Sequence, residues 1–256
     1  MRRPQAMIFD VDGTLADTER DGHRAAFNAA FREAGLDWEW SVERYGQLLA
    51  VTGGKERIRH YMAESQPDFR PPMDIDAFVA DLHQRKTRHY LSMLQEGQIP
   101  LRPGVKRLLQ EAESAGLTLA IATTTTPDNV VYLLEANLGQ EGVKRFSVIA
   151  AGDIVAAKKP APDIYYYTLD ALGLAAEACV AFEDSENGLR SAQQAGVPVF
   201  AVVNDYTRQQ AFPGALAVLD RFGGPGDVPE VIAGDVGPGR YVDLPLVQEL
   251  WERGQR

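Results

Sequence analysis

The chain has 256 residues, a formal net charge of −10 and a single cysteine, and its apolar and charged fractions, 45% and 24%, are ordinary for a globular protein. The negative charge argues against nucleic acid or an anionic membrane as a partner, because both repel a negatively charged surface. One cysteine excludes an intramolecular disulfide, and we find neither a signal-peptide pattern nor a stretch long enough to cross a bilayer. We therefore expect a cytoplasmic protein, and we expect it to be a monomer.

The first apolar run, residues 7–9, predicts a short buried strand that is followed by Asp10-Val-Asp-Gly-Thr. Because side chains alternate along a strand, Asp10 and Asp12 are expected to point the same way, and Gly13 permits a sharp turn. Two crowded carboxylates need a cation or a shared proton, which favours a hard divalent ion such as Mg²⁺. By itself, Asp-x-Asp-Gly also fits a calcium loop or a solvated turn.

The next segment, residues 19–36, is predicted to be a helix that ends at Gly35. Glu19 and His23 are four residues apart and should share one face near the start of this helix. An exposed helix face is the alternative explanation. The position directly after the aspartates favours contact with a substrate.

Residues 36–94 have helical character without a strand-rich unit, and Tyr45 is predicted to lie in their core. Gly53 and Gly54 expose backbone N–H groups at a predicted helix start, where Lys55 and Arg57 add positive charge. This combination suits an anion, although a plain charged helix start looks the same.

A second cationic run, residues 83–88, follows a loop rich in Pro and Asp. Such a run is usually a solvated helix face. Lys86 is the member that we select as a candidate ligand-binding group.

Beyond residue 100 the pattern changes to alternating strands and helices. Strands are predicted at 117–122, 146–150, 179–182 and 197–203, and helices at 104–115, 127–138, 163–172 and 187–195. This alternation predicts an α/β fold with a doubly wound parallel sheet. We expect residues 1–18 and 96–222 to form this core, 19–95 a helical cap inserted after the first strand, and 223–256 an extension packed on the core with a helix near 244–251.

Polar residues follow three of these strands, at the edge where sites of such sheets lie. Thr123 begins a run of four threonines in which Thr124, Thr125 and the nearby Asn129 could hold a phosphoryl oxygen, although such a run also suits strand propensity and capping.

The third and fourth segments carry charge. Lys159 stands in Lys-Lys-Pro-Ala-Pro-Asp before a helix and could balance the charge of Asp10 and of a phosphoryl group. Glu183 and Asp184 end another apolar strand and supply further hard oxygen ligands.

Together, these four segments resemble the motifs of the haloacid dehalogenase-like phosphohydrolases. The resemblance implies that Asp10 is the nucleophile and Asp12 the general acid/base. It also implies that Thr123 and Lys159 bind the phosphoryl group. The implied metal ion is Mg²⁺, with Asp10, Asp12, Glu183 and Asp184 as its predicted ligands.

The cap segments resemble one group in that family, the CbbY phosphatases, which act on xylulose-1,5-bisphosphate. The matching segments include Asp10–Glu19, Thr52–Ile58 and Lys86-Thr87. The resemblance implies a sugar-phosphate substrate bound by Glu19, His23, Tyr45, Gly53, Gly54, Lys55, Arg57, Lys86, Thr124, Thr125 and Asn129. One departure is that Glu19 and His23 are one residue further apart than in close relatives.

Three alternatives remain. A phosphoglycolate phosphatase and a β-phosphoglucomutase-like phosphotransferase would keep the same core motifs. The mutase relatives place a lysine soon after the second motif, where this chain has Thr126-Pro127, which favours hydrolysis. A non-catalytic binding protein on the same scaffold is disfavoured, because the complete set of motif residues is present.

Overall fold

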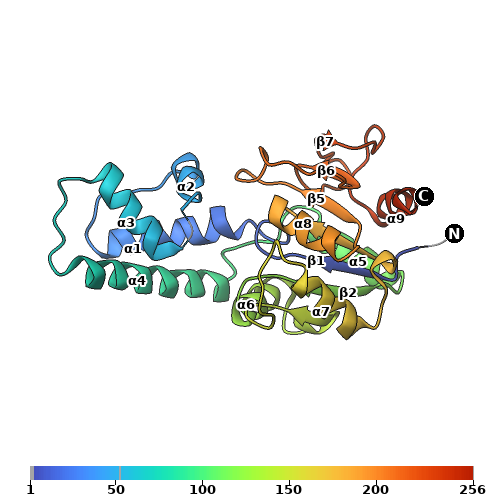
Figure 1. The fold of residues 1–256 in the computed structure, drawn as a ribbon, viewed down its shortest axis with the longest axis horizontal. Coiled ribbons are helices and arrows are strands. Elements are labelled where there is room, and N and C mark those ends of the chain that lie inside the picture. Colours follow the sequence, from blue (N-terminus) through green and yellow to red (C-terminus); the bar gives the residue numbers. More distant parts are fainter. Residues whose placement is uncertain (1–2, 52, 256) are drawn as a thin grey trace. The chain divides into compact units, whose positions relative to one another are not determined.

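The computed structural model describes residues 3–51 and 53–255, and Thr52 of the predicted cap motif lies outside them. The chain divides into two compact units (Figure 1). We call Met1–Asp17 with Pro100–Arg256 the core unit and Thr18–Ile99 the cap unit. Among the described residues, no helix combines the length and apolar character that a membrane crossing requires.

The core unit is built on a seven-stranded sheet of order β3-β2-β1-β4-β5-β6-β7. All neighbouring strands pair in parallel except β6 and β7, which are antiparallel. The predicted doubly wound sheet is therefore confirmed, with an antiparallel strand added at one edge. The strands are β1 (Ala6–Phe9), β2 (Thr118–Ala122), β3 (Phe146–Ala150), β4 (Cys179–Glu183), β5 (Val199–Val202), β6 (Ala217–Leu219) and β7 (Val231–Ala233).

Helices cover both faces of this sheet (Figure 1). They are α5 (Val105–Ser114), α6 (Pro127–Leu138), α7 (Asp163–Leu172), α8 (Glu186–Gln194) and α9 (Leu244–Gly254), with short 3₁₀ turns at Val143–Arg145 and Ala176–Ala178. The central strand β1 is buried throughout, as a parallel strand covered on both sides must be. Ile8 packs toward α7 and α8, whereas the ring of Phe9 stacks on Phe182 with centroids 4.8 Å apart.

Two strands were not predicted, β6 and β7. Each has three residues and stands among turns, so no periodic pattern of useful length marks it. The tail 223–256 supplies β7 and α9, and the indole Nε1 of Trp251 in α9 donates a hydrogen bond to the Cys179 carbonyl at 3.1 Å. The tail thus completes one edge of the sheet and closes over the start of β4.

The cap unit is helical, as predicted for this segment. It contains α1 (Arg24–Glu33), α2 (Val42–Leu48), α3 (Gly54–Ser65) and α4 (Ile75–Gln95). Its core is aromatic: the fully buried Trp40 lies 4.6 Å from Phe27 and 4.9 Å from Phe31, measured between ring centroids. Asn28 fixes the backbone of Trp40 by donating to its carbonyl at 3.0 Å and accepting from its N–H at 2.8 Å.

The first turn of the cap differs from the prediction. Thr18–His23 forms a π-helix that continues into α1, where an α-helix from residue 19 was expected. A π-helix closes its hydrogen bonds over five residues instead of four and is frequently found at functional sites. Gly22 allows this turn to pack closely, because a Cβ there would lie 2.6 Å from Ile99 and 2.7 Å from Tyr90.

Candidate active site

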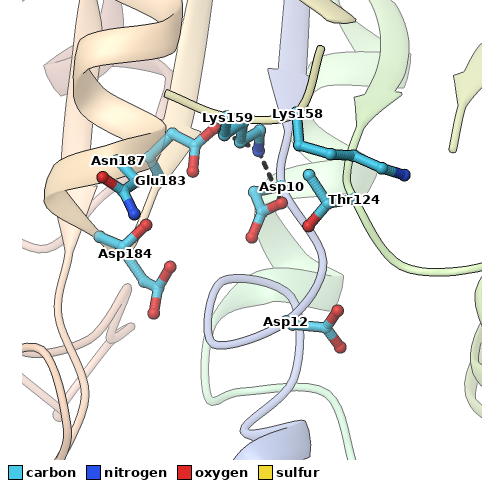
Figure 2. Close-up of a pocket in the computed structure, with 9 residues that line it drawn as sticks. Asp10, Asp12, Thr124, Lys158, Lys159, Glu183, Asp184 and Asn187 are labelled. Atoms are coloured by element: carbon cyan, nitrogen blue, oxygen red, sulfur yellow. Dashed lines mark hydrogen bonds and ion pairs between the residues drawn. The ribbon is translucent and has the colours of Figure 1, made fainter. Parts of the chain in front are cut away.

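The carboxyl ends of the core strands meet at one pocket of about 360 Å³ (Figure 2). Parallel strands place their carboxyl ends at the same edge of a sheet, so residues far apart in the sequence converge there. The pocket is lined by Asp10, Asp12, Thr124, Lys158, Lys159, Glu183, Asp184, Ser185 and Asn187.

A buried lysine organises this pocket. The Nζ atom of Lys159 donates to Asp10 Oδ1 at 2.8 Å, to Glu183 Oε1 at 2.6 Å and to the Ala122 carbonyl at 2.8 Å. Burial by itself lowers the pKa of Lys159, but the charges of Asp10 and Glu183 prevail, and the net shift is upward. The ammonium group therefore stays charged. The neighbouring Lys158 instead pairs with exposed Asp153 at 2.8 Å.

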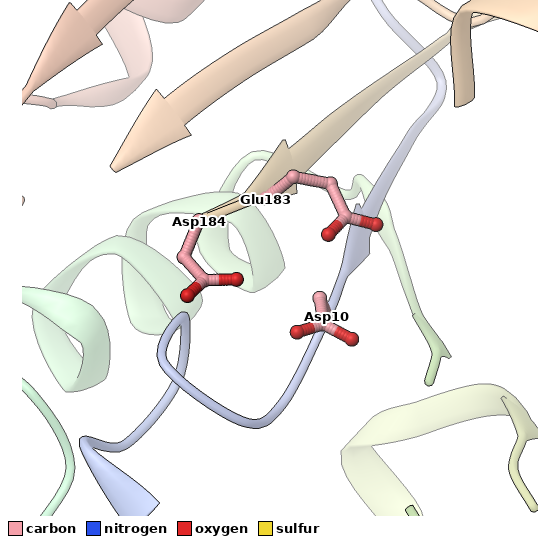
Figure 3. A group of neighbouring side chains, drawn as sticks. All are labelled: Asp10, Glu183 and Asp184. Atoms are coloured by element: carbon pink, nitrogen blue, oxygen red, sulfur yellow. The ribbon is translucent and has the colours of Figure 1, made fainter. Parts of the chain in front are cut away.

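Three carboxylates gather beside Lys159. One oxygen from each of Asp10, Glu183 and Asp184 lies within 4.8 Å of the other two, and all three residues are buried (Figure 3). Burial raises the pKa of Glu183 to about 7 and that of Asp184 well above its usual range. The physical cause is that three negative charges share a dry site with one ammonium group.

The carboxylate group fits a hard divalent cation. Oε2 of Glu183 is buried and has no hydrogen-bond partner among the described residues. An unpartnered buried carboxylate oxygen is costly, and an ion with oxygen ligands such as Mg²⁺ would satisfy it. The donor set of Asp10, Glu183 and Asp184 is thus suitable for a hard divalent cation, and Asp12, the fourth predicted ligand, is not part of this group.

Asp12 lies apart from these carboxylates. The strand β1 ends at Phe9, and the carbonyl of Val11 then accepts hydrogen bonds from the N–H groups of Thr14, Leu15 and Ala16. This tight loop follows Asp10 directly, and Asp10 and Asp12 both line the pocket. Figure 2 shows Asp12 on its own side of the pocket lining, away from Asp184.

The threonine run after β2 is divided between core and pocket. Thr123 is 1% exposed and its Oγ1 accepts from the N–H of Thr125 at 3.4 Å, whereas exposed Thr124 lines the pocket. Asn129, in the first turn of α6, donates to Thr125 Oγ1 at 3.2 Å. Thr124 is therefore the member of the run whose side chain faces the pocket.

The sequence did not indicate two residues that hold the acidic group. Tyr165 in α7 donates to Glu183 Oε1 at 2.5 Å, and Asn204 donates to Asp184 Oδ2 at 2.7 Å. Asn204 could have been found from the sequence, because it is a polar residue directly after the strand predicted at 197–203. Tyr165 lies on a helix face, where nothing distinguishes it from a core aromatic.

The cap unit contains a network of hydrogen bonds that links Arg57, Tyr45 and Glu19. Tyr45 donates its hydroxyl to Glu19 Oε2 at 2.6 Å and accepts from Arg57 Nη1 at 2.9 Å. Arg57 is 9% exposed and also donates to the carbonyls of Leu48 at 3.1 Å and Val51 at 3.3 Å. The contacts of Arg57 thus hold Tyr45 and the end of α2 in place, and through Tyr45 they orient Glu19.

His23 contacts a different helix from Glu19. Its ring stacks on Tyr90 at 3.9 Å between centroids, and its Nδ1 lies 2.7 Å from Lys86 Nζ. Burial, followed by the charge of Lys86, lowers the pKa of His23 well below its usual value. A neutral imidazole therefore accepts a hydrogen bond from the ammonium group, which also lies 5.2 Å from the Phe27 ring centroid.

The glycine pair of the cap opens α3, as predicted. Gly53 is the N-cap with φ of 94°, and Gly54 is the first residue of the helix. Lys55 is exposed beside them. A Cβ at Gly54 would lie 2.7 Å from the His83 ring of α4, so the second glycine is required by helix packing.

Comparisons with known proteins agree with this geometry. A family model described as haloacid dehalogenase-like hydrolase matches residues 4–196. The chain is 47% identical over 251 residues to the plasmid CbbY protein of Cupriavidus necator, an alignment that covers 98% of this chain and 97% of that protein.

Two crystal structures of CbbY from Rhodobacter sphaeroides are also similar. One, in complex with phosphate, has 46% identity, and the other, a mutant in complex with xylulose-(1,5)bisphosphate, has 45%. Each has a TM-score of 0.69, and each match covers 85% of this chain and 94% of the other chain. These matches, with the lysine and carboxylates assembled at the strand ends, show that the chain belongs to the haloacid dehalogenase-like hydrolase family and is a CbbY-like phosphatase.

Proposed function

We propose that this phosphatase hydrolyses xylulose-1,5-bisphosphate in a Mg²⁺-dependent reaction that passes through an aspartyl-phosphate. The observation that carries the mechanism is the placement of Asp10, which lies 2.8 Å from Lys159 within a buried group of three carboxylates. The substrate assignment is supported by the Rhodobacter sphaeroides CbbY mutant that holds this sugar bisphosphate.

The reaction has two displacements at phosphorus. In the first, a carboxylate oxygen of Asp10 attacks the phosphorus, the bond to the sugar oxygen breaks, and Asp12 gives its proton to that oxygen. In the second, Asp12 takes a proton from water, whose oxygen attacks the phosphorus and releases inorganic phosphate and free Asp10. Lys159 is held beside Asp10 to stabilise the charge on the transferring group.

Threonines complete the phosphoryl site in this proposal. Thr123 was selected from the motif, and Thr124 is exposed to the pocket. We propose that Thr123 and Thr124 form the hydrogen bond with a phosphoryl oxygen. Asn129 donates a hydrogen bond to Thr125 Oγ1 at 3.2 Å, and this contact supports the turn that carries Thr123 and Thr124.

We assign Mg²⁺ to Asp10, Glu183 and Asp184, with Asp12 as a further predicted ligand. When bound, the ion would neutralise negative charge on the phosphoryl group and on the carboxylates. Asn204 and Tyr165 would keep Asp184 and Glu183 in place by the hydrogen bonds described above.

We assign the second phosphate of the substrate to the cap unit. The backbone N–H groups of Gly53 and Gly54 lie at the start of the twelve-residue helix α3, where exposed Lys55 adds a positive charge. Lys86 is a second cation, oriented by His23 at 2.7 Å. Arg57 contributes by holding Tyr45.

The decisive experiment is phosphate release from xylulose-1,5-bisphosphate, with and without Mg²⁺, beside 2-phosphoglycolate and β-glucose-1-phosphate. We expect Mg²⁺-dependent release with a strong preference for the bisphosphate. Equal or faster turnover of either monophosphate would refute the substrate assignment and leave the mechanism standing. Asp10→Asn should abolish turnover in a folded protein, and near-normal hydrolysis by this variant would refute the aspartyl-phosphate.

A further inference from the structure

A buried arginine lies outside the four sequence motifs. Arg102 precedes α5, at the point where the chain re-enters the core unit, and its side chain is 4% exposed. Its Nη1 donates to the carbonyls of Gly13 and Val202, the second at 2.8 Å. Its Nη2 donates to the carbonyls of Val203 at 2.6 Å and Asp220 at 2.7 Å.

These four carbonyls belong to three separate segments. They follow or end β1, β5 and β6, where a strand runs out and its carbonyls no longer have strand partners. The planar guanidinium group presents several N–H donors in fixed directions, so it can hold several carbonyls at once in a way that the ammonium group of lysine cannot. Arg102 therefore fixes the relative positions of three strand ends.

Two of those segments frame Asp184. Gly13 approaches it so closely that a Cβ there would lie 2.2 Å from Asp184 Oδ2. Val203 is followed by Asn204, which donates to the same oxygen at 2.7 Å. Arg102 thus holds the loop after Asp12 and the Asn204 segment on either side of one carboxylate of the proposed metal site.

The backbone around Arg102 strengthens the same connection. The N–H of Arg102 donates to the Leu15 carbonyl at 2.8 Å, and Leu101 forms an antiparallel bridge with Ala16. The Nε of Arg102 lies 3.3 Å from Asp17 Oδ1. The returning chain is therefore bound to the second half of the loop that begins at Asp10, at Gly13, Leu15, Ala16 and Asp17.

We propose that Arg102 is a positioning residue for the phosphatase reaction, because it holds Gly13 and Asn204 against Asp184 and so keeps the metal site in its binding arrangement. This inference rests on the proposed Mg²⁺-dependent function. It adds to that function a residue that is not among the proposed metal or substrate ligands and that acts through the two segments beside Asp184.

A purely structural role is the competing explanation, and Arg107 provides a matched control. Arg107 in α5 also binds two backbone carbonyls, those of Gly223 at 2.9 Å and Val242 at 2.8 Å, but these lie in the tail of the core unit. Arg107→Met should therefore lower the stability of the protein without changing its affinity for Mg²⁺.

The experiment compares Arg102→Lys, Arg102→Met and Arg107→Met with the wild type. Stability is measured by urea denaturation in a chelator, and Mg²⁺ binding by calorimetry of the folded protein without substrate. We expect Arg102→Lys to remain folded and to bind Mg²⁺ about tenfold to a hundredfold more weakly, the usual loss when a group that supports metal ligands is replaced. In turnover assays, raising Mg²⁺ should recover much of its kcat.

Unchanged Mg²⁺ affinity in folded Arg102→Lys would overturn the proposal, and so would an equal loss of affinity in Arg107→Met. Arg102→Met is informative if it folds, but the lysine variant decides the question without it. Because calorimetry needs no substrate, this result is separable from the proposed function. A wild type that binds Mg²⁺ but hydrolyses no phosphate ester would refute the function and leave the comparison of Arg102 variants valid.

Discussion

Replacing Glu183 by glutamine should reduce the dependence of stability on pH in the metal-free protein. Glu183 is fully buried, and burial raises its pKa from 4.5 to about 7. A carboxyl group whose pKa is higher in the folded state stabilises the protein fully below its unfolded pKa. That stabilisation is lost as the pH rises through the folded value. Glutamine resembles the protonated acid at every pH and does not titrate.

The size of the effect follows from the shift. Each pKa unit corresponds to about 1.4 kcal/mol, so the rise to about 7 gives a loss of about 3 kcal/mol in the free energy of unfolding, most of it between pH 5 and pH 8. The wild type should therefore lose about 2 to 3 kcal/mol more than Glu183→Gln between these two pH values. Taking the difference between pH values cancels any packing cost of the new side chain.

The assay is urea denaturation in a chelator at pH 5 and pH 8. Glu141→Gln is the matched control, because this side chain is 75% exposed and its replacement also removes one carboxylate. The control should keep the pH dependence of the wild type. Adding Mg²⁺ at pH 8 should stabilise the wild type and stabilise Glu183→Gln less, because the variant lacks one proposed ligand. If Glu183→Gln and the wild type lost the same free energy between pH 5 and pH 8, the burial argument would be refuted.

Three further predictions concern other parts of the chain. Gly188→Ala would place a Cβ 1.8 Å from Glu183 Oε2, so we expect a stability loss of about 1 to 3 kcal/mol and weaker Mg²⁺ binding in calorimetry. The control is Gly224→Ala, whose Cβ would lie 3.6 Å from its nearest neighbour, Arg107 Nε, and which should show neither effect. Burial raises the pKa of the Cys179 thiol to about 12, so a thiol reagent at pH 8 should label the protein in urea and not in its native state, and rapid native labelling would contradict this assignment. Tyr45→Phe removes the hydroxyl that connects Glu19 with Arg57, and we expect a stability loss of about 1 kcal/mol and a higher KM for the bisphosphate. The control is Tyr61→Phe in α3, because the Tyr61 hydroxyl accepts a hydrogen bond from Gln66 that is long, at 3.5 Å. An unchanged KM in Tyr45→Phe would mean that the orientation of Glu19 by Tyr45 does not affect substrate binding.

Hydrophobic periodicity located most of the core sheet. Helices 127–138 and 163–172 occupy the predicted ranges, because each begins near a proline and ends before a glycine. Strand 146–150 also occupies its predicted range. The prediction missed β6 and β7, which have three residues each. Their positions depend on the neighbouring strand, which supplies the hydrogen bonds that a short segment cannot form alone.

The π-helix at Thr18–His23 was also beyond the reach of the sequence pattern. The spacing of Glu19 and His23 suggested one shared face, as in an α-helix. In the structure Glu19 contacts Tyr45, whereas His23 contacts Lys86 and Tyr90. The choice between the two helix types depends on packing against α4, where Gly22 permits close approach.

By itself, the sequence determined which chemical groups stand at the strand ends, since the alternation of strands and helices already implies a parallel sheet with one common edge. That reasoning brings Asp10, Lys159 and Glu183 together, and their contacts of 2.6 and 2.8 Å are found in the structure. Only the tertiary structure decided which residues hold those groups in place. The contact of Arg102 with the Gly13 carbonyl joins positions 89 residues apart in the chain. No local pattern encodes such a contact, because it arises from the packing of segments that meet only after the sheet has formed.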